Sequence, residues 1–169
     1  RIVIKNEFKE SVKAKSENLI LIFNSTPFYA ESGGQVGDIG SVYNEKNELV
    51  AEIVDTQRTP GDIFLHFVNN NNLDLEIESH YYLKIDFERR IKIRNNHSAT
   101  HLLHESLRQI VGDHVSQRGS LVNDDKLRFD YSSNEPLKIS LTNKVEELVN
   151  NSIRSNMKVI IQNNVQKYS

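Results

Sequence analysis

The stretch ERRIKIRNNHSATHLLHESLRQIV, residues 88–111, has a helical pattern with histidines on one side. An α-helix turns by about 100° per residue, so His97 and His101 share one face and His104 lies beside them. The neighbouring stripe is apolar and predicts a buried face; it consists of Ala99, Leu103, Leu107 and Ile110. The three imidazoles therefore lie next to a core, where they are either half-buried polar side chains or ligands.

Both ends of this helix carry recognisable signals. Asp86 is a suitable N-cap, and Glu88 places an acidic residue in the first turn, where the helix dipole favours it. Gly112 follows the last apolar residue, as is common just after a helix ends. The sequence therefore predicts a helix over residues 88–111.

The residues before this helix are mostly predicted to form strands. Runs rich in Ile, Leu, Val, Phe and Tyr alternate with turns formed by asparagine, glycine and proline. The predicted strands cover residues 19–23, 40–43, 49–55, 63–68 and 75–87. Short strands with this spacing are typical of a small barrel or sandwich. We therefore expect a small β-barrel-like subdomain over residues 1–87.

The residues after the helix predict a hairpin and a second helix. The hairpin strands are expected at 115–122 and 127–131, joined by a turn at 123–125. An amphipathic helix follows Thr142, and residues 158–162 could add one more strand. The fold class is therefore α+β, with a second domain over residues 88–169 in which the histidine-bearing helix packs on an antiparallel sheet.

Composition excludes several classes of protein. With 37% apolar and 26% charged residues the chain is typical of soluble globular proteins, and its longest apolar run, five residues, is too short to cross a bilayer. A net charge of −2 argues against a generally basic nucleic-acid binder, although basic residues cluster within residues 89–94. The absence of cysteine excludes disulfides and thiolate zinc ligands, and it fits a cytoplasmic location.

The spacing of His97 and His101 is one found at zinc sites, because side chains four residues apart can reach one ion from successive helical turns. Ser98, Ala99 and Thr100 lie between them, without the glutamate that metalloproteases use as a general base. Protease chemistry is therefore not supported. The alternative to metal binding is a pair of hydrogen-bonded helix histidines.

The glycine-rich stretch SGGQVGD, residues 32–38, is the second candidate for chemistry. Its spacing matches neither a phosphate-binding P-loop nor a dinucleotide fingerprint, and it could be an ordinary turn between strands. It also offers backbone amides that a ligand can approach closely. The neutral side chain of Gln35 can donate and accept hydrogen bonds together, which suits an ester or a water molecule.

Three stretches together resemble the editing domain of alanyl-tRNA synthetases. They are TPFYAESGGQVGDIG at 26–40, NHSATHLLHESL at 96–107, and DHVSQRGSLV with LRFD at 113–122 and 127–130. Their order and separation match the family over nearly the whole chain. Stand-alone alanyl-tRNA editing proteins and the editing domain of threonyl-tRNA synthetase share the histidine helix, whereas the long first stretch looks more like the alanyl enzyme.

The resemblance implies an esterase within an enzyme that joins alanine to tRNA(Ala) using ATP. Its substrate would be tRNA(Ala) mischarged with serine or glycine, and residues 88–169 would form an α/β editing core. The implied partners are the acceptor end of tRNA(Ala) and the remainder of the synthetase chain, with no membrane. The alternative is a module that binds the acceptor stem of tRNA without hydrolysing the ester.

The resemblance also implies a zinc site. His97 and His101 match the first two ligands of the family, and the other two come from a later Cys-Gly-Gly-Thr-His motif that this sequence lacks. We expect the chain to be truncated at its C-terminal end for this reason. A site with two of four ligands should bind zinc weakly, so it could be empty or filled by water.

Further residues take roles from the same resemblance. Gln35 is the expected catalytic residue, acting on the ester carbonyl. The expected substrate-binding residues are Thr26, which would sense the serine hydroxyl, together with Gly33, Gly34 and Arg128. For Arg128 and Arg118 the alternative is ordinary surface charge on the hairpin. The whole interpretation requires that the histidines and the glycine-rich turn converge on one cleft.

Overall fold

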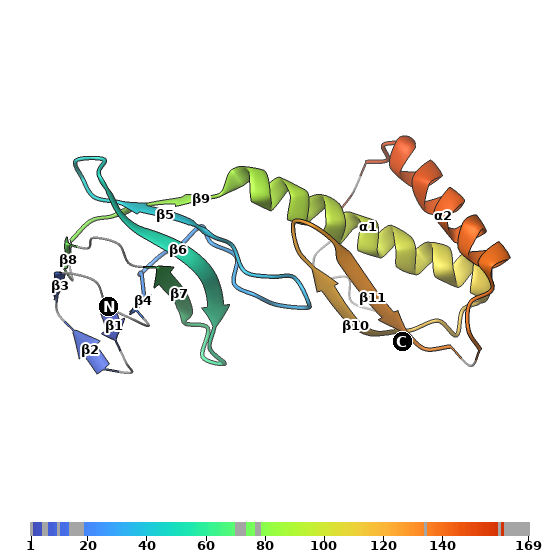
Figure 1. Cartoon of the computed structure of the whole chain (residues 1–169), viewed down its shortest axis with the longest axis horizontal. Coiled ribbons are helices and arrows are strands. Elements are labelled where there is room, and N and C mark those ends of the chain that lie inside the picture. Colours follow the sequence, from blue (N-terminus) through green and yellow to red (C-terminus); the bar gives the residue numbers. More distant parts are fainter. Residues whose placement is uncertain are drawn as a thin grey trace.

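The computed structural model describes residues 2–4, 7–9, 11–13, 19–69, 74–76, 79–133, 135–158 and 160. This part of the chain is α+β, with antiparallel sheets at one end and a long helix reaching to a hairpin and a second helix at the other (Figure 1). The strands are β1 (Ile2–Ile4), β2 (Glu7–Lys9), β3 (Ser11–Lys13), β4 (Leu19–Leu21), β5 (Gly40–Tyr43), β6 (Leu49–Arg58), β7 (Phe64–Asn69), β8 (Asp74–Glu76), β9 (Tyr82–Ile85), β10 (Gln117–Val122) and β11 (Leu127–Tyr131). The helices are α1 (Phe87–Val111) and α2 (Ile139–Arg154).

Seven strands form one sheet in the order β2-β1-β4-β7-β6-β5-β9, and their pairings are antiparallel. The ten-residue β6 pairs with β5 on one side and β7 on the other. Within the part of the chain that the structure describes, no pairing joins β2 to β9, so these strands form an open sheet. The barrel-like subdomain expected over residues 1–87 is therefore not confirmed, and the division into domains stays a prediction.

Several predicted elements differ from the observed ones. The run at 75–87 is two strands, because β8 pairs with β3 in a small separate sheet while β9 pairs with β5. The three strands before residue 19 were not predicted. Helix α2 begins at Ile139, earlier than expected, and the backbone oxygen of Lys138 accepts bonds from its first turn. The predicted strand at 158–162 falls mainly outside the described residues.

The predicted end signals of α1 are confirmed. The side chain of Asp86 accepts a hydrogen bond from the backbone nitrogen of Arg89 at 2.9 Å. At the other end, Gly112 has a φ of 135°, and its N–H donates to the carbonyl of Arg108. None of the helices in the described ranges has the length and apolar character needed to span a membrane.

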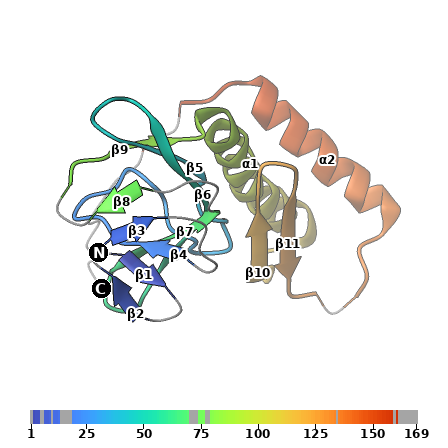
Figure 2. The same ribbon diagram turned by 60° about the vertical axis from the view of Figure 1, so that its left-hand side comes forward.

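Two apolar clusters hold the structure together. The first lies in the strand-rich end and consists of Leu19, Leu21, Phe28, Val42, Val50, Ala51, Ile53, Val68 and Leu75. The second has buried Leu107, Val115 and Val145 at its centre, where α1 meets α2 and the β10–β11 hairpin (Figure 2). The C-terminal half of α1 is therefore committed to packing, as the stripe containing Leu103 and Ile110 predicted.

The segment between β4 and β5, residues 22–39, connects the two ends of the molecule, and we call it the bridging loop (Figure 1). On one side the N–H of Glu31 donates to the carbonyl of Thr56 in β6 at 2.9 Å. On the other side Val36 and Val122 are joined by a backbone hydrogen bond of 3.1 Å, which ties the loop to β10. Its position is therefore fixed by both the sheet and the hairpin.

Candidate functional site

The tip of the bridging loop is a two-residue turn. The backbones of Ser32 and Gln35 exchange hydrogen bonds of 3.1 and 3.0 Å across it. Between them Gly33 and Gly34 have φ values of 59° and 86°. Positive φ at both central residues is the geometry of the type I′ hairpin turn, which glycine adopts without steric cost. The two glycines therefore allow the chain to turn sharply just before Gln35.

The same glycines let the turn lie directly on β10. The carbonyl of Gly34 accepts from the N–H of Val122 at 2.8 Å, and the carbonyl of Gly33 accepts from the hydroxyl of Ser120 at 3.1 Å. A Cβ at Gly34 would overlap the side chain and carbonyl of Ser120. Neither glycine lines the pocket described below. Their expected contact with substrate therefore stays a prediction, beside a structural role that is visible.

Gln35 and His97 meet across the gap between the bridging loop and α1. Gln35 is 8% exposed, and its Oε1 lies 2.6 Å from Nδ1 of His97. A carbonyl oxygen can only accept, so Nδ1 of His97 carries the proton of this bond. Burial, followed by the neighbouring His101, lowers the pKa of His97 and favours the neutral ring. Its Nε2 is then left with a lone pair.

The two helix histidines stack on each other. The ring centroids of His97 and His101 are 5.0 Å apart with planes inclined by 20°, and His101 is exposed. A lone pair on Nε2 of His97, with Nδ1–H donated to an amide oxygen, is the arrangement that metal-binding histidines usually show. The described residues contain no group of three or more metal-binding side chains. The donor set therefore fits half of a tetrahedral zinc site.

His104 lies farther along α1, against the hairpin. Its ring is 5.0 Å from that of Phe129, and its buried Nε2 has no hydrogen-bond partner among the residues that are described. Phe129 belongs to the apolar residues around the second cluster. This placement fits a polar residue at the edge of the core, which was one of the two roles the sequence left open.

A pocket of about 550 Å³ opens beside Gln35 and His97. Its walls come from the bridging loop, from the first half of α1 and from the facing ends of β6 and β7. The lining residues are Pro27, Phe28, Tyr29, Ala30, Ser32, Gln35, Arg58, Phe64, Arg90, Arg94 and His97. The required convergence of the glycine-rich turn and the histidine face on one cleft is therefore present for Gln35 and His97.

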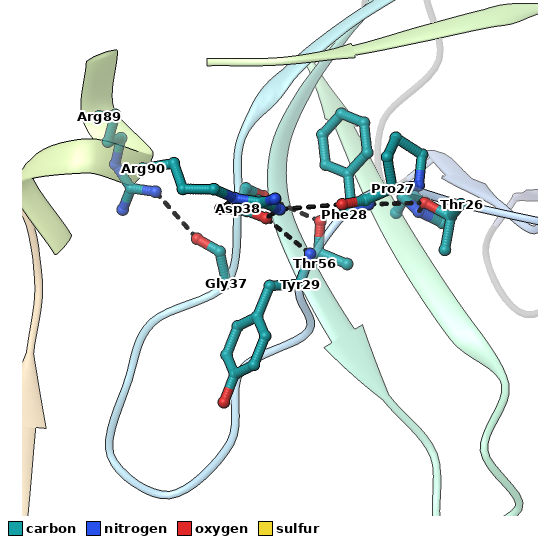
Figure 3. A network of polar contacts seen from close by, with 10 residues as sticks. Thr26, Pro27, Phe28, Tyr29, Gly37, Asp38, Thr56, Arg89 and Arg90 are labelled. Atoms are coloured by element: carbon teal, nitrogen blue, oxygen red, sulfur yellow. Dashed lines mark hydrogen bonds and ion pairs between the residues drawn. The ribbon is translucent and has the colours of Figure 1, made fainter. Parts of the chain in front are cut away.

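A buried ion pair fixes one wall of this pocket (Figure 3). Asp38 is 3% exposed, and its carboxylate accepts hydrogen bonds from the guanidinium of Arg90 and from the N–H of Tyr29, the latter at 2.6 Å. Arg90 also donates to the carbonyl of Pro27 at 2.9 Å. Burial, and then the nearby charge of Arg94, lower the pKa of Arg90. The pair therefore clamps the bridging loop to α1.

Thr26 is held on the sheet side of the loop. Its hydroxyl lies 2.8 Å from Nε2 of His66 and accepts from the N–H of Phe28 at 3.1 Å. Nδ1 of His66 lies 3.1 Å from the carbonyl of Leu21, so Nδ1 carries the proton and Nε2 accepts from the threonine. Thr26 does not line the pocket, whereas Pro27 and Phe28 do. The structure therefore does not bring Thr26 to Gln35 as an immediate neighbour.

Arg128 lies on β11 and pairs with Asp130 at 3.1 Å, where the side chain of Arg128 is exposed and that of Asp130 is about half exposed. Arg118, on β10, is also exposed. Neither lines the pocket. The structure therefore does not bring these two arginines to Gln35, and their contact with RNA stays a prediction.

The sequence indicated Arg90 and Arg94 only as part of the basic cluster at residues 89–94, and it did not indicate Arg58 as a candidate. Arg90 and Arg94 precede His97 by seven and three residues, so the helical period already places all three on one face. That signal was available in the sequence. Arg58 and Phe64 come from the ends of β6 and β7, and only the folded sheet brings them to α1.

The buried His66 predicts how stability depends on pH. Burial lowers its pKa, and the bond to the carbonyl of Leu21 opposes this to a smaller extent. Below about pH 6.5 the unfolded chain therefore binds more protons than the folded chain does. The free energy of unfolding should fall as pH drops, by at most about 1.4 kcal/mol per pH unit. Urea unfolding between about pH 7.5 and 5 measures this slope. His66→Gln should reduce the slope, and an unchanged slope would contradict the assignment.

The chain is similar in sequence to a known family of proteins. A family model described as tRNA synthetases class II (A) matches residues 1–89. The alanine–tRNA ligase of Lactobacillus acidophilus is 52% identical over 141 residues, which are 83% of this chain and 16% of the relative. The alanine–tRNA ligases of Fusobacterium nucleatum and Chelativorans sp. are 45% and 41% identical, over 88% and 94% of this chain. The chain covers only 17% and 18% of these two longer relatives.

Proposed function

Because this chain belongs to the class II (A) family of tRNA synthetases, we propose that it is the editing segment of an alanine–tRNA ligase. In this role it hydrolyses the ester of tRNA(Ala) mischarged with serine or glycine, as part of a cytoplasmic enzyme that joins alanine to tRNA(Ala) using ATP. The observation that carries the proposal is the hydrogen bond between Gln35 and His97 at the edge of a pocket.

In the proposed reaction Gln35 acts as a hydrogen-bond donor. Its Oε1 is occupied by His97, so the side chain is held in one orientation and its amide N–H groups remain for the substrate. Donors fixed in advance stabilise negative charge as it develops on an ester carbonyl oxygen, and they are most effective where water is excluded. Because Gln35 is 8% exposed, it meets that condition.

His97 and His101 would hold zinc, which when bound supplies polarisation of a water molecule or of the ester carbonyl. Gln35 would support this role through its hydrogen bond to Nδ1 of His97, which fixes the ring and keeps Nδ1 protonated. Thr26 stays a proposed substrate-binding residue. Its hydroxyl proton is donated to His66, so towards a serine hydroxyl it would act as an acceptor.

A second candidate function is binding of the acceptor end of tRNA without hydrolysis. The observation that favours it is the set of two imidazoles at the site, where a catalytic zinc usually has three protein ligands. Deacylation of seryl-tRNA(Ala) with zinc supplied separates the two functions. It is measured for this chain and for a longer chain that adds the Cys-Gly-Gly-Thr-His segment. Hydrolysis by neither chain would overturn the editing proposal.

Replacing Gln35 tests the proposed donor. Gln35→Ala should lower turnover by about 100-fold, the effect of losing one oxyanion donor, while the affinity for uncharged tRNA changes by less than about twofold. Gln35→Glu keeps an acceptor for His97 but removes the amide donors. It should therefore be nearly as slow as the alanine variant. A glutamate variant with full turnover would show that Gln35 only orients His97.

A further inference from the structure

The pocket beside Gln35 is strongly cationic in an otherwise slightly acidic chain. Arg58, Arg90 and Arg94 line it, whereas the chain as a whole carries a formal charge of −2. Among the lining residues that the structure describes there is no carboxylate. A concave site with one sign of charge concentrates ligands of the opposite sign. The pocket is therefore suited to an anionic ligand.

The three arginines differ in how far their charge is already used. Arg90 is paired with the buried carboxylate of Asp38 and is part of the wall. Arg94 is exposed, and no carboxylate in the described ranges pairs with it. Among the described residues, Arg58 pairs only with Asp62, at 3.4 Å, and the side chain of Asp62 is 80% exposed. Such a surface pair is weak, so Arg58 and Arg94 both remain able to bind an anion.

The rest of the pocket is aromatic and apolar. Tyr29 is 37% exposed at its rim, and the half-buried Phe64 faces the same space. Aromatic rings beside arginines are a common arrangement where single-stranded nucleic acid binds, because bases stack on the rings while the cations meet the phosphates. The volume of about 550 Å³ lies within the usual range for small-ligand pockets.

We propose that Arg94 and Arg58 form a phosphate-binding subsite for the last internucleotide phosphate of a single-stranded RNA 3′ end, with the terminal nucleoside against Tyr29 and Phe64. This inference rests on the proposed function, since it places the RNA whose ester Gln35 would face. Arg94 lies about one helical turn before His97, so a phosphate on Arg94 leaves the 3′ end of the strand within reach of the Gln35–His97 pair.

The test uses the whole 169-residue chain and a fluorescein-labelled RNA pentanucleotide with a free 3′ hydroxyl. Fluorescence anisotropy gives the dissociation constant over a series of salt concentrations. Arg94→Gln and Arg58→Gln should each weaken binding by about fivefold or more at low salt. The variant that lacks both arginines should reduce the slope of log K against log salt by about 0.7, because the two arginines neutralise one phosphate. Arg154→Gln, a change of charge at the exposed end of α2, should leave the affinity and the slope unchanged.

A chemical change in the RNA locates the phosphate. A neutral methylphosphonate at the last internucleotide position should weaken binding to the unaltered chain but not to the double variant Arg58→Gln/Arg94→Gln, because both arginines contact that phosphate. Three results would overturn the subsite. They are a methylphosphonate effect that adds in full to the effect of the double variant, an equal loss of RNA affinity in Arg154→Gln, and no measurable binding at millimolar RNA. This RNA carries no ester, so its binding does not depend on hydrolysis. If the arginine variants weaken RNA binding as expected but seryl-tRNA(Ala) is not hydrolysed, only the editing proposal is overturned.

Discussion

Asp38→Ala is expected to lower the free energy of unfolding by about 3 kcal/mol, because it leaves the guanidinium of Arg90 partly buried without its partner. The side chain of Asp38 is 4% exposed, and its carboxylate also accepts from the N–H of Tyr29. That N–H would lose its acceptor as well. Urea unfolding followed by circular dichroism measures the change. The pocket wall formed by Pro27 and Tyr29 should loosen with it.

Two controls separate this pair from an ordinary surface contact. Asp62 has a positive φ of 59°, which asparagine tolerates as well as aspartate does. Asp62→Asn removes the exposed charge that pairs with Arg58 and should cost at most about 1 kcal/mol. Asp38→Ala combined with Arg90→Met removes both charges and should be less destabilising than Asp38→Ala alone. Equal losses of unfolding free energy for Asp38→Ala and Asp62→Asn would show that the buried pair between the bridging loop and α1 contributes no more to stability than a surface pair.

Gly34→Ala is expected to cost about 3 kcal/mol or more, because two unfavourable effects coincide. The positive φ of 86° is strained for any residue with a Cβ, and that Cβ would overlap the backbone of β10 at Ser120. Thermal unfolding and hydrolysis of seryl-tRNA(Ala) are the two measurements. The melting temperature and the hydrolysis rate should both fall, since displacement of the turn also moves Gln35.

The chain offers a matched series for this glycine. Gly33 has a φ of 59° with no atom near its missing Cβ, so Gly33→Ala should cost only about 1 kcal/mol. Gly61 has neither restriction, since the nearest atom to its missing Cβ is 3.9 Å away. Gly61→Ala should change stability by less than about 0.5 kcal/mol. An order other than Gly34, Gly33, Gly61 would contradict the contact with β10.

Much of the helical half could be predicted from the sequence because its signals are local. Asp86 and Gly112 mark the ends of α1, and both are seen to cap it. The hairpin β10–β11 was also expected from its turn residues. These signals work because a cap or a turn depends on atoms within a few residues of itself.

The strand-rich half was harder, because strand partners are chosen by tertiary structure. Nothing local shows that residues 75–87 divide between two sheets, or that β6 pairs on both sides. The same holds for the site. The meeting of Gln35 and His97 was expected through a family resemblance, whereas Arg58 and Phe64 reach the pocket only because β6 and β7 end beside α1.

The double attachment of the bridging loop bears on how the molecule folds. The contact between Ser120 and Gly33 spans 87 positions of the chain, and that between His97 and Gln35 spans 62. Closing loops of this length is slow compared with forming a helix or a hairpin. During synthesis on the ribosome, the turn that carries Gln35 cannot contact His97 until α1 has emerged, and it cannot contact Ser120 and Val122 until β10 has emerged. The candidate site around Gln35 is therefore among the last features to be assembled.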